Sequence, residues 1–183
     1  MAPDGPVAAR SRAPRNGRRR KKLSGRLVEA AAFGETGTVR ALLRAGADPD
    51  GANTDGTTPL YAAAVGGTTE IVALLLEAGA SPDVESRDET DGTPLCAAAA
   101  WGHADVVRHL LAHGADPGLR EDDGEGRSPL EWAGNGHHTR TAELLLAAGA
   151  QGPDGTARGP GARPRRGGRG RGAAPRAGGG GGA

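Results

Sequence analysis

Histidines and the one cysteine come closest to a catalytic or metal-binding pattern in this sequence. His109 and His113 stand four residues apart, a spacing that places two ligands on one face of a helix. No glutamate lies between them as in an H-E-x-x-H site, and Cys96 has no second cysteine with which to form a Cys-pair zinc site. The adjacent His137 and His138 add no ligand geometry. We therefore expect no metal site.

The signatures of other enzymes are also missing from the sequence. It contains no G-x-S-x-G around a nucleophilic serine. It has no phosphate-binding G-x-x-x-x-G-K-[ST] either, because the only lysines are Lys21 and Lys22. The glycine run 178–182 follows no predicted strand and opens no helix, so it is not a dinucleotide-binding loop. We predict a protein that is not an enzyme and that has no cofactor.

Charged residues are unevenly distributed along the 183 residues, although the net charge is only +1. Residues 1–26 hold nine basic residues and one acidic residue, a balance of +8. Residues 152–183 hold seven basic residues and one acidic residue, a balance of +6. Residues 27–151 hold 7 basic and 20 acidic residues, a balance of −13. This distribution excludes a wholly basic nucleic-acid binder and predicts an anionic domain between two cationic tails.

The helices that must position the histidines and the charged residues are marked by motifs that repeat with a regular period. Pro59, Pro94 and Pro129 are spaced by 35 residues. Four Gly-Ala pairs are spaced by 33, 35 and 35 residues, and they begin at positions 46, 79, 114 and 149. Two helical stretches fit between each proline and the next Gly-Ala pair, at 59–65 and 69–78 in one unit and at 94–101 and 104–113 in the next. Such units bury their apolar faces only against their neighbours, so the period predicts a helical solenoid.

Helix signals recur in phase with this period. Thr58, Thr93 and Ser128 are predicted N-caps, each followed by a proline at the first helical position. Each second helix is predicted to end at a glycine that can adopt the left-handed conformation. The first helix of each unit is rich in alanine, and the second carries an apolar stripe. These features predict an all-α fold with closely packed helices.

The repeated segments resemble the ankyrin-repeat family. The resemblance rests on the start motifs Asp55-Gly56-Thr57-Thr58-Pro59-Leu60 and Asp91-Gly92-Thr93-Pro94-Leu95, and on Gly102-His103-Ala104-Asp105-Val106-Val107 with the Gly-Ala-Asp that follows. It implies an all-α solenoid of four helix-turn-helix repeats, at about 27–55, 56–91, 92–126 and 127–151. It also implies that His103 is a structural turn residue. In the fourth unit, His137 replaces the glycine that links the helices, so we expect that turn to be distorted or loose.

In this family the residue before the inter-helix glycine faces the partner on the concave helix face. In the four repeats this position is occupied by Phe33, Gly66, Trp101 and Gly136. The resemblance therefore implies that Phe33 and Trp101 are partner-binding residues. The alternative is that Trp101 folds back and packs on the alanine-rich helix. Trp132 occupies a position that is leucine in the family's repeats, and we expect its side chain in the core.

Loop tips are the second partner-binding region that the resemblance implies, at 52–57, 85–92 and 120–127. The second and third tips are longer than the family's usual period allows, and both are acidic. We expect them to steer a basic partner; the alternative is that they only keep the protein soluble. The candidate acidic residues are Glu85, Asp88, Glu89, Glu121, Asp122, Asp123 and Glu125.

Both tails lack a hydrophobic period, so we predict a disordered basic arm at 1–26 and a disordered Gly/Arg-rich tail at 152–183. Arginine outnumbers lysine 21 to 2, a bias typical of a GC-rich, bacterial genome. Asn16–Lys22 would be a nuclear localisation candidate in a eukaryotic chain, but we favour a disordered arm.

The predicted function is a non-enzymatic protein-protein interaction module that acts as a cytoplasmic monomer away from membranes. The alternative is a nucleic-acid-associated adaptor whose Arg-rich tails bind RNA or DNA weakly while the repeats recruit a protein.

Overall fold

Helices make up most of the part of the chain that the structure describes. The computed structural model describes residues 15–87 and 92–152. The α-helices in these ranges are α1 (Arg15–Ala32), α2 (Thr36–Arg44), α3 (Pro59–Val65), α4 (Thr69–Glu77), α5 (Pro94–Ala100), α6 (Ala104–Ala112), α7 (Pro129–Asn135) and α8 (Thr139–Ala147), and a 3-10 helix, η1, covers Asp122–Gly124. The predicted all-α class is confirmed.

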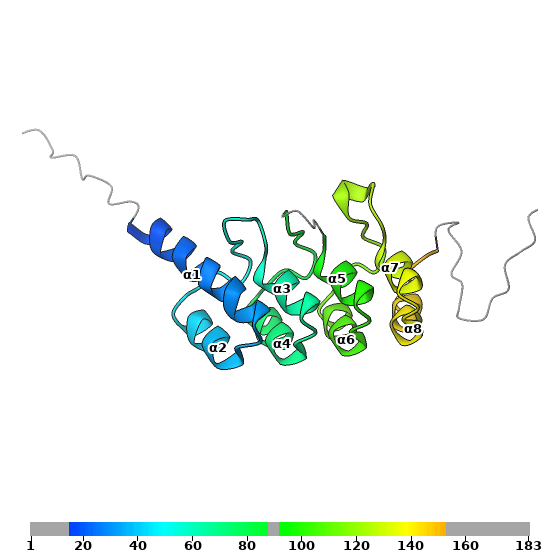
Figure 1. Ribbon diagram of the computed structural model, residues 1–183, viewed down its shortest axis with the longest axis horizontal. Helices are drawn as coiled ribbons and strands as arrows, with labels where there is room; N and C mark the ends of the chain where they lie inside the picture. The colour runs from blue at the N-terminus through cyan, green and yellow to red at the C-terminus, as the bar shows by residue number, and fades with distance from the viewer. Residues whose placement is uncertain (1–14, 88–91, 153–183) are drawn as a thin grey trace, which may run out of the picture.

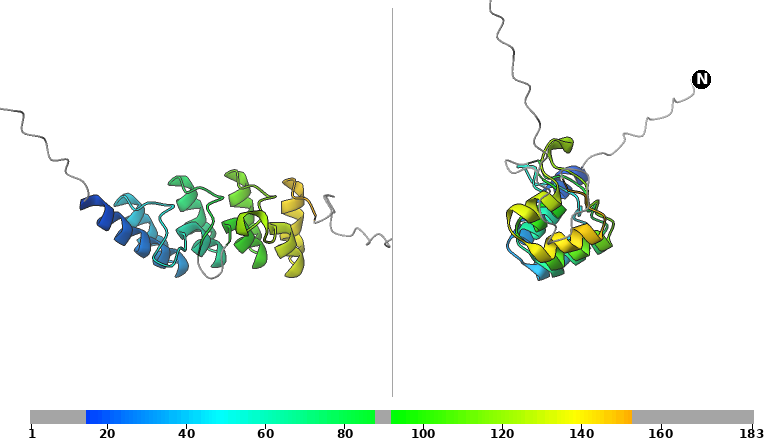
Figure 2. Two further views of the ribbon diagram at one scale, coloured as in Figure 1. Left: turned by 90° about the horizontal axis from the view of Figure 1, so that it is seen from above. Right: turned by 90° about the vertical axis from the view of Figure 1, so that its right-hand side faces the viewer.

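The helices are stacked in two rows (Figure 1). α1, α3, α5 and α7 lie side by side in one row, which we call the inner row, and α2, α4, α6 and α8 form the outer row. Figure 2 shows that the pairs follow one another along a single axis. Each pair contacts the pairs before and after it, so the predicted solenoid is also confirmed.

Small residues allow the inner helices to approach closely. Ala31, Ala63 and Ala98 are fully buried within that row. Between the rows, Leu75 and Leu110 are fully buried as well, and each such leucine contributes about 1.5–3 kcal/mol relative to an exposed one. The alternation of small inner and larger outer residues thus gives one core that runs through all four pairs.

Three inner helices, α3, α5 and α7, begin at the predicted N-caps. The side-chain oxygens of Thr58, Thr93 and Ser128 accept hydrogen bonds of 3.3, 3.2 and 3.3 Å from backbone N–H groups three residues later. At Ser128 the bond is reciprocated, because the Glu131 carboxylate accepts the Ser128 N–H at 2.8 Å and completes a capping box. These bonds fix where α3, α5 and α7 start.

The outer helices end at the predicted glycines. Gly79 and Gly114 have φ values of 93° and 87°. After Gly79, the N–H of Ala80 reaches back to the carbonyl oxygen of Leu75 at 2.9 Å, and the same bond follows Gly114. This is the Schellman arrangement, and it satisfies carbonyl groups that the helix end would leave unpaired.

Two histidines hold neighbouring repeats together. His103 donates from Nε2 to the carbonyl oxygen of Val65 at 3.1 Å, which confirms its predicted structural role. His138 makes the equivalent bond to the carbonyl oxygen of Ala100 at 3.0 Å. No structural role was predicted for His138 from the sequence, although it lies one 35-residue period after His103.

The prediction of a distorted turn at His137 is wrong. His137 adopts a left-handed φ of 57°, close to the 72° of Gly102 one period earlier. The hydrogen bonds of the turn are the same in both repeats; His138 N–H, for example, bonds to the carbonyl oxygen of Ala133 at 2.9 Å. The backbone keeps its regular path, and the strain is confined to a non-glycine residue with positive φ.

The predicted disordered arm is wrong for residues 15–26, because α1 begins at Arg15. Arg26, which takes the place of the repeat's proline, lies inside this helix. Leu23 packs against the core and Ser24 is buried. These contacts stabilise a helix that the composition alone did not predict. Residues 1–14 and 153–183 lie outside the described residues, and the disorder predicted for them stays a prediction.

Candidate functional site

A groove runs along α5 on the inner row. Its volume is about 480 Å³. We call it the α5 groove and define it by its lining residues, which come from α3, α5, α7 and the third loop: Tyr61, Cys96, Ala97, Ala100, Trp101, Glu121, Trp132, Asn135 and Gly136. Because the α5 residues in this set are small except for Trp101, the groove lies between the larger side chains of its neighbours.

The aromatic residues predicted to face a partner are exposed. Trp101 caps the C-terminal end of α5 and keeps 63% of its surface accessible, and Phe33, just after α1, keeps 80%. These are the large hydrophobic residues that the described part of the chain leaves exposed. Trp101 therefore does not fold away against the alanines of α5, as the alternative interpretation required. It lines one end of the groove.

Trp132 is only partly in the core, where the sequence had placed it entirely. Its ring packs against the core and also lines the α5 groove. The indole Nε1 donates a hydrogen bond of 2.7 Å to Oε2 of Glu121. The guanidinium carbon of Arg127 lies 4.7 Å from the ring centroid, within range of a cation–π interaction.

The prediction that Glu121 belongs to an exposed acidic tip is wrong. Glu121 is 9% exposed, and its carboxylate points to Trp132 and to the Cys96 thiol. Burial raises the pKa of the Glu121 carboxyl above its ordinary value, although the hydrogen bonds from Trp132 and Cys96 act in the opposite direction. The reason for its inward position is that a partly buried indole N–H requires an acceptor.

Cys96 has the environment of a structural cysteine. Its side chain is buried below the groove, and burial raises the pKa of the thiol far above its ordinary value. The sulfur contacts the carbonyl oxygen of Arg127 at 3.6 Å. Because the thiolate is the reactive form, this cysteine is inert as a nucleophile at neutral pH.

The loops at the N-terminal ends of α3, α5 and α7 stand side by side above the inner row (Figure 1). The N–H of Arg87 donates to the carbonyl oxygen of Gly56 at 3.2 Å, which joins the first loop to the second. Oε1 of Glu85 accepts the N–H of Asp122 at 2.9 Å, which joins the second loop to the third. These bonds hold the three loops as one row.

The remaining acidic candidates are spread along this loop row. Asp122 and Glu125 are exposed, and Glu85 is half-buried. Asp123 falls within η1. Asp88 and Glu89 lie outside the described residues. Of the acidic residues predicted for the third loop, the structure therefore shows Asp122 and Glu125 as exposed and Glu121 as buried.

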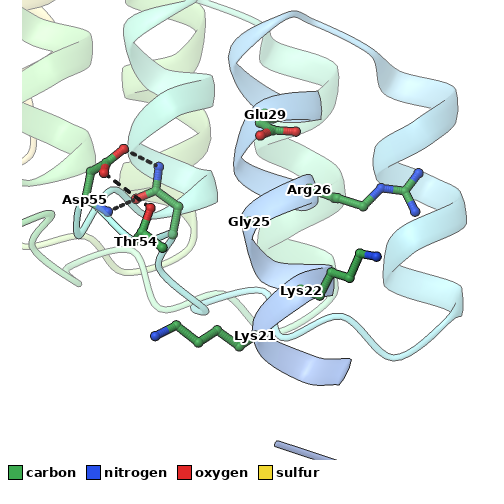
Figure 3. A pocket seen from close by; sticks show the side chains of 8 residues that line it. Lys21, Lys22, Gly25, Arg26, Glu29, Thr54 and Asp55 are labelled. Atoms are coloured by element: carbon green, nitrogen blue, oxygen red, sulfur yellow. Dashed lines mark hydrogen bonds between the residues drawn. The ribbon is translucent and has the colours of Figure 1, made fainter. Parts of the chain in front are cut away.

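A second pocket, of about 500 Å³, lies between α1 and the first loop. Figure 3 shows Lys21, Lys22 and Arg26 projecting from α1, with Thr54 and Asp55 on the loop. All three basic residues are exposed. The sequence predicted that they belong to a disordered arm, whereas the structure places them on α1 at one end of the solenoid (Figure 1).

Within the described residues no cluster of three or more His, Cys, Asp or Glu side chains could hold a metal ion. His113 bonds through Nδ1 to the carbonyl oxygen of His109 at 2.8 Å, so these two histidines form a local contact within α6. No helix in the part of the chain that is described is both long and apolar enough to span a membrane.

The stacked helix pairs with loops at one edge define the protein as a helical repeat solenoid. The family model for ankyrin repeats, which contains three copies of the repeat, matches residues 27–121 and 83–155. These matches cover more than half of the chain, and the protein belongs to the ankyrin-repeat family. Members of this family are in general protein-protein interaction modules and are typically not enzymes. A comparison with curated proteins found no match.

Proposed function

We propose that this protein binds a partner protein with a basic surface through the inner helix face and the acidic loop row. The observation that carries this proposal is the exposure of Trp101 at one end of the α5 groove. Exposed tryptophans beside a groove are frequent anchors of protein interfaces, and their truncation often costs about 2 kcal/mol or more of binding free energy. Phe33 lies in the corresponding position two repeats earlier and provides a second anchor.

Charge supports the same partner chemistry. Residues 27–151 hold 20 acidic and 7 basic residues, and Glu85, Asp122 and Glu125 lie along the loop row above the groove. Such a row attracts a basic surface and raises its rate of association, mainly at low ionic strength. Loop charges therefore contribute to encounter, and the aromatic residues contribute to the lifetime of the complex.

The test is affinity capture with the immobilised full chain and three variants. Proteins retained by the wild type should be lost with Trp101→Ala and Phe33→Ala. They should be retained with Glu143→Ala, a matched control on an exposed position of α8 in the outer row. Thermal unfolding of each variant checks that the fold persists. Equal retention by all three variants would contradict the proposed face.

The second candidate is a nucleic-acid-associated adaptor. Lys21, Lys22 and Arg26 support it, because all three are exposed on α1, where phosphate groups could approach. The test is a salt titration of binding to random-sequence DNA and RNA, for the full chain and for a chain without residues 1–26 and 152–183. Only an adaptor of this kind would bind the nucleic acid with a steeply salt-dependent affinity that is lost when the tails are removed. We propose a cytoplasmic location with either function, because the single cysteine is a free thiol, as is usual in a reducing compartment.

A further inference from the structure

Glu121 places a carboxylate inside the α5 groove. It is the acidic residue that lines this groove, and the other named acids of the loop row do not. Oε2 accepts the Trp132 indole N–H, and Oε1 lies close to Gly92, where a side chain of any size would collide with it. Among the described residues no lysine or arginine forms an ion pair with Glu121. The groove therefore has a carboxylate that is desolvated without a cationic partner, which favours a ligand that supplies the cation.

Aromatic rings flank the same position. Trp132 and Tyr61 line the groove on the two sides of α5. The guanidinium of Arg127 already lies over the Trp132 ring, 4.7 Å from its centroid, in a cation–π interaction. A planar guanidinium suits this combination best, because it can stack on an aromatic face and donate to a carboxylate at the same time.

The two ends of the groove are separated by a fixed length of helix. Glu121 interacts with Cys96 at the beginning of α5, and Trp101 follows its end. Cys96 and Trp101 are five positions apart, which corresponds to about 7.5 Å along a helix. An extended peptide covers this distance in about two or three residues.

We propose that the α5 groove binds an extended segment of the partner that presents an arginine to Glu121 and an apolar side chain to Trp101, about two or three residues apart. This inference rests on the proposed function, because it assumes that the inner face binds a protein. It adds the chemical class of the ligand and the two positions along α5 at which the ligand's side chains bind.

The experiment uses a phage-displayed library of random peptides selected on the full chain. The enriched peptides should share an arginine and an apolar residue at this spacing. In fluorescence anisotropy, replacing that arginine with glutamine should weaken binding to the wild type roughly tenfold, the effect of losing one charged hydrogen-bonded pair. The same peptide change should have almost no further effect on Glu121→Gln, whose amide oxygen can still accept the Trp132 N–H.

Glu77→Gln is the matched control, because it removes one negative charge from an exposed position of α4 outside the groove. It should bind the selected peptides as the wild type does. Additive losses from Glu121→Gln and from the peptide change would overturn the inference, as would enriched peptides without a basic residue.

Two outcomes separate this inference from the proposed function. If Trp101→Ala abolishes peptide binding while Glu121→Gln does not change it, the inner face binds proteins but the arginine site is wrong. If no peptide is enriched, the inference is also overturned, whereas capture of a folded partner still tests the proposed function. The peptide substitution needs only the wild-type protein, so this arm does not depend on the folding of a variant.

Discussion

The indole Nε1 of Trp132 lies 2.7 Å from Oε2 of Glu121 and donates a hydrogen bond to it. This bond connects the third loop to α7, and it turns an acidic side chain away from solvent into the α5 groove. This contact thus contributes to the rigidity of the loop row, and it places the Glu121 carboxylate on the inner face.

Trp132→Phe is expected to destabilise the protein by about 1–3 kcal/mol, because the nearly buried Glu121 carboxylate loses a donor. The measurement is the free energy of unfolding in urea. Trp101→Phe is the matched control; since Trp101 is largely exposed, its change should stay within about 0.5 kcal/mol. Equal effects of the two substitutions would show that the Trp132–Glu121 bond does not stabilise the fold.

The stability contributed by Glu121 should decrease as the pH rises. Burial raises its pKa in the folded protein above the value in the unfolded chain, so the folded state binds more protons in the window between the two values. Glutamine has no charge to bury at any pH. The free energy of unfolding of Glu121→Gln, relative to the wild type, should therefore increase as the pH rises above the ordinary pKa of a glutamate, about 4.3. A flat or falling difference in denaturation experiments would contradict this.

His137→Gly is expected to stabilise the fourth repeat. His137 has a φ of 57°, and the corresponding position in the third repeat is Gly102. Relief of the left-handed strain, less the entropy that glycine adds to the unfolded chain, should raise the free energy of unfolding by about 0.5–1 kcal/mol.

The reciprocal change at the third repeat should have the opposite sign. A Cβ at Gly102 would collide with the imidazole of His138 in the next repeat, so Gly102→Ala should lower the free energy of unfolding. If His137→Gly is destabilising in the same urea titrations, the side chain of His137 makes a contribution that the strain argument omits.

Removal of residues 1–26 should destabilise the solenoid more than removal of residues 1–22. The longer deletion also removes Leu23, which packs against the core, and the buried Ser24. We expect the longer deletion to lower Tm by about 3 °C or more relative to the shorter one. Equal Tm values in calorimetry would mean that this turn of α1 does not belong to the folded domain.

Periodic features of the sequence predicted most of the fold. The spacing of Pro59, Pro94 and Pro129 located the starts of three inner helices, since proline and the capping residue before it act locally. The beginning of α1 could not be predicted in this way. Its first residues are Arg- and Gly-rich, and the contacts that order Leu23 and Ser24 come from another part of the chain.

The site was predicted in part for a similar reason. Phe33 and Trp101 occupy the same position of the repeat. Because each repeat has the same helix geometry, this position is exposed in both. The inward position of Glu121 could not be recognised from the sequence, because Glu121 is one of four acidic residues in the third loop. It depends on the partner that the Trp132 N–H requires, and on η1, where Asp122 has a φ of 50°. These are tertiary features that local composition does not specify.

Binding of a purified partner to Trp101→Ala tests the proposed function most directly. Isothermal titration calorimetry should give a Kd roughly thirtyfold higher than that of the wild type, which corresponds to a loss of about 2 kcal/mol. The Tm should change little, because Trp101 is 63% exposed. An unchanged Kd, or a loss of affinity accompanied by an equal loss of folding free energy, would contradict the assignment of the inner face as the binding surface.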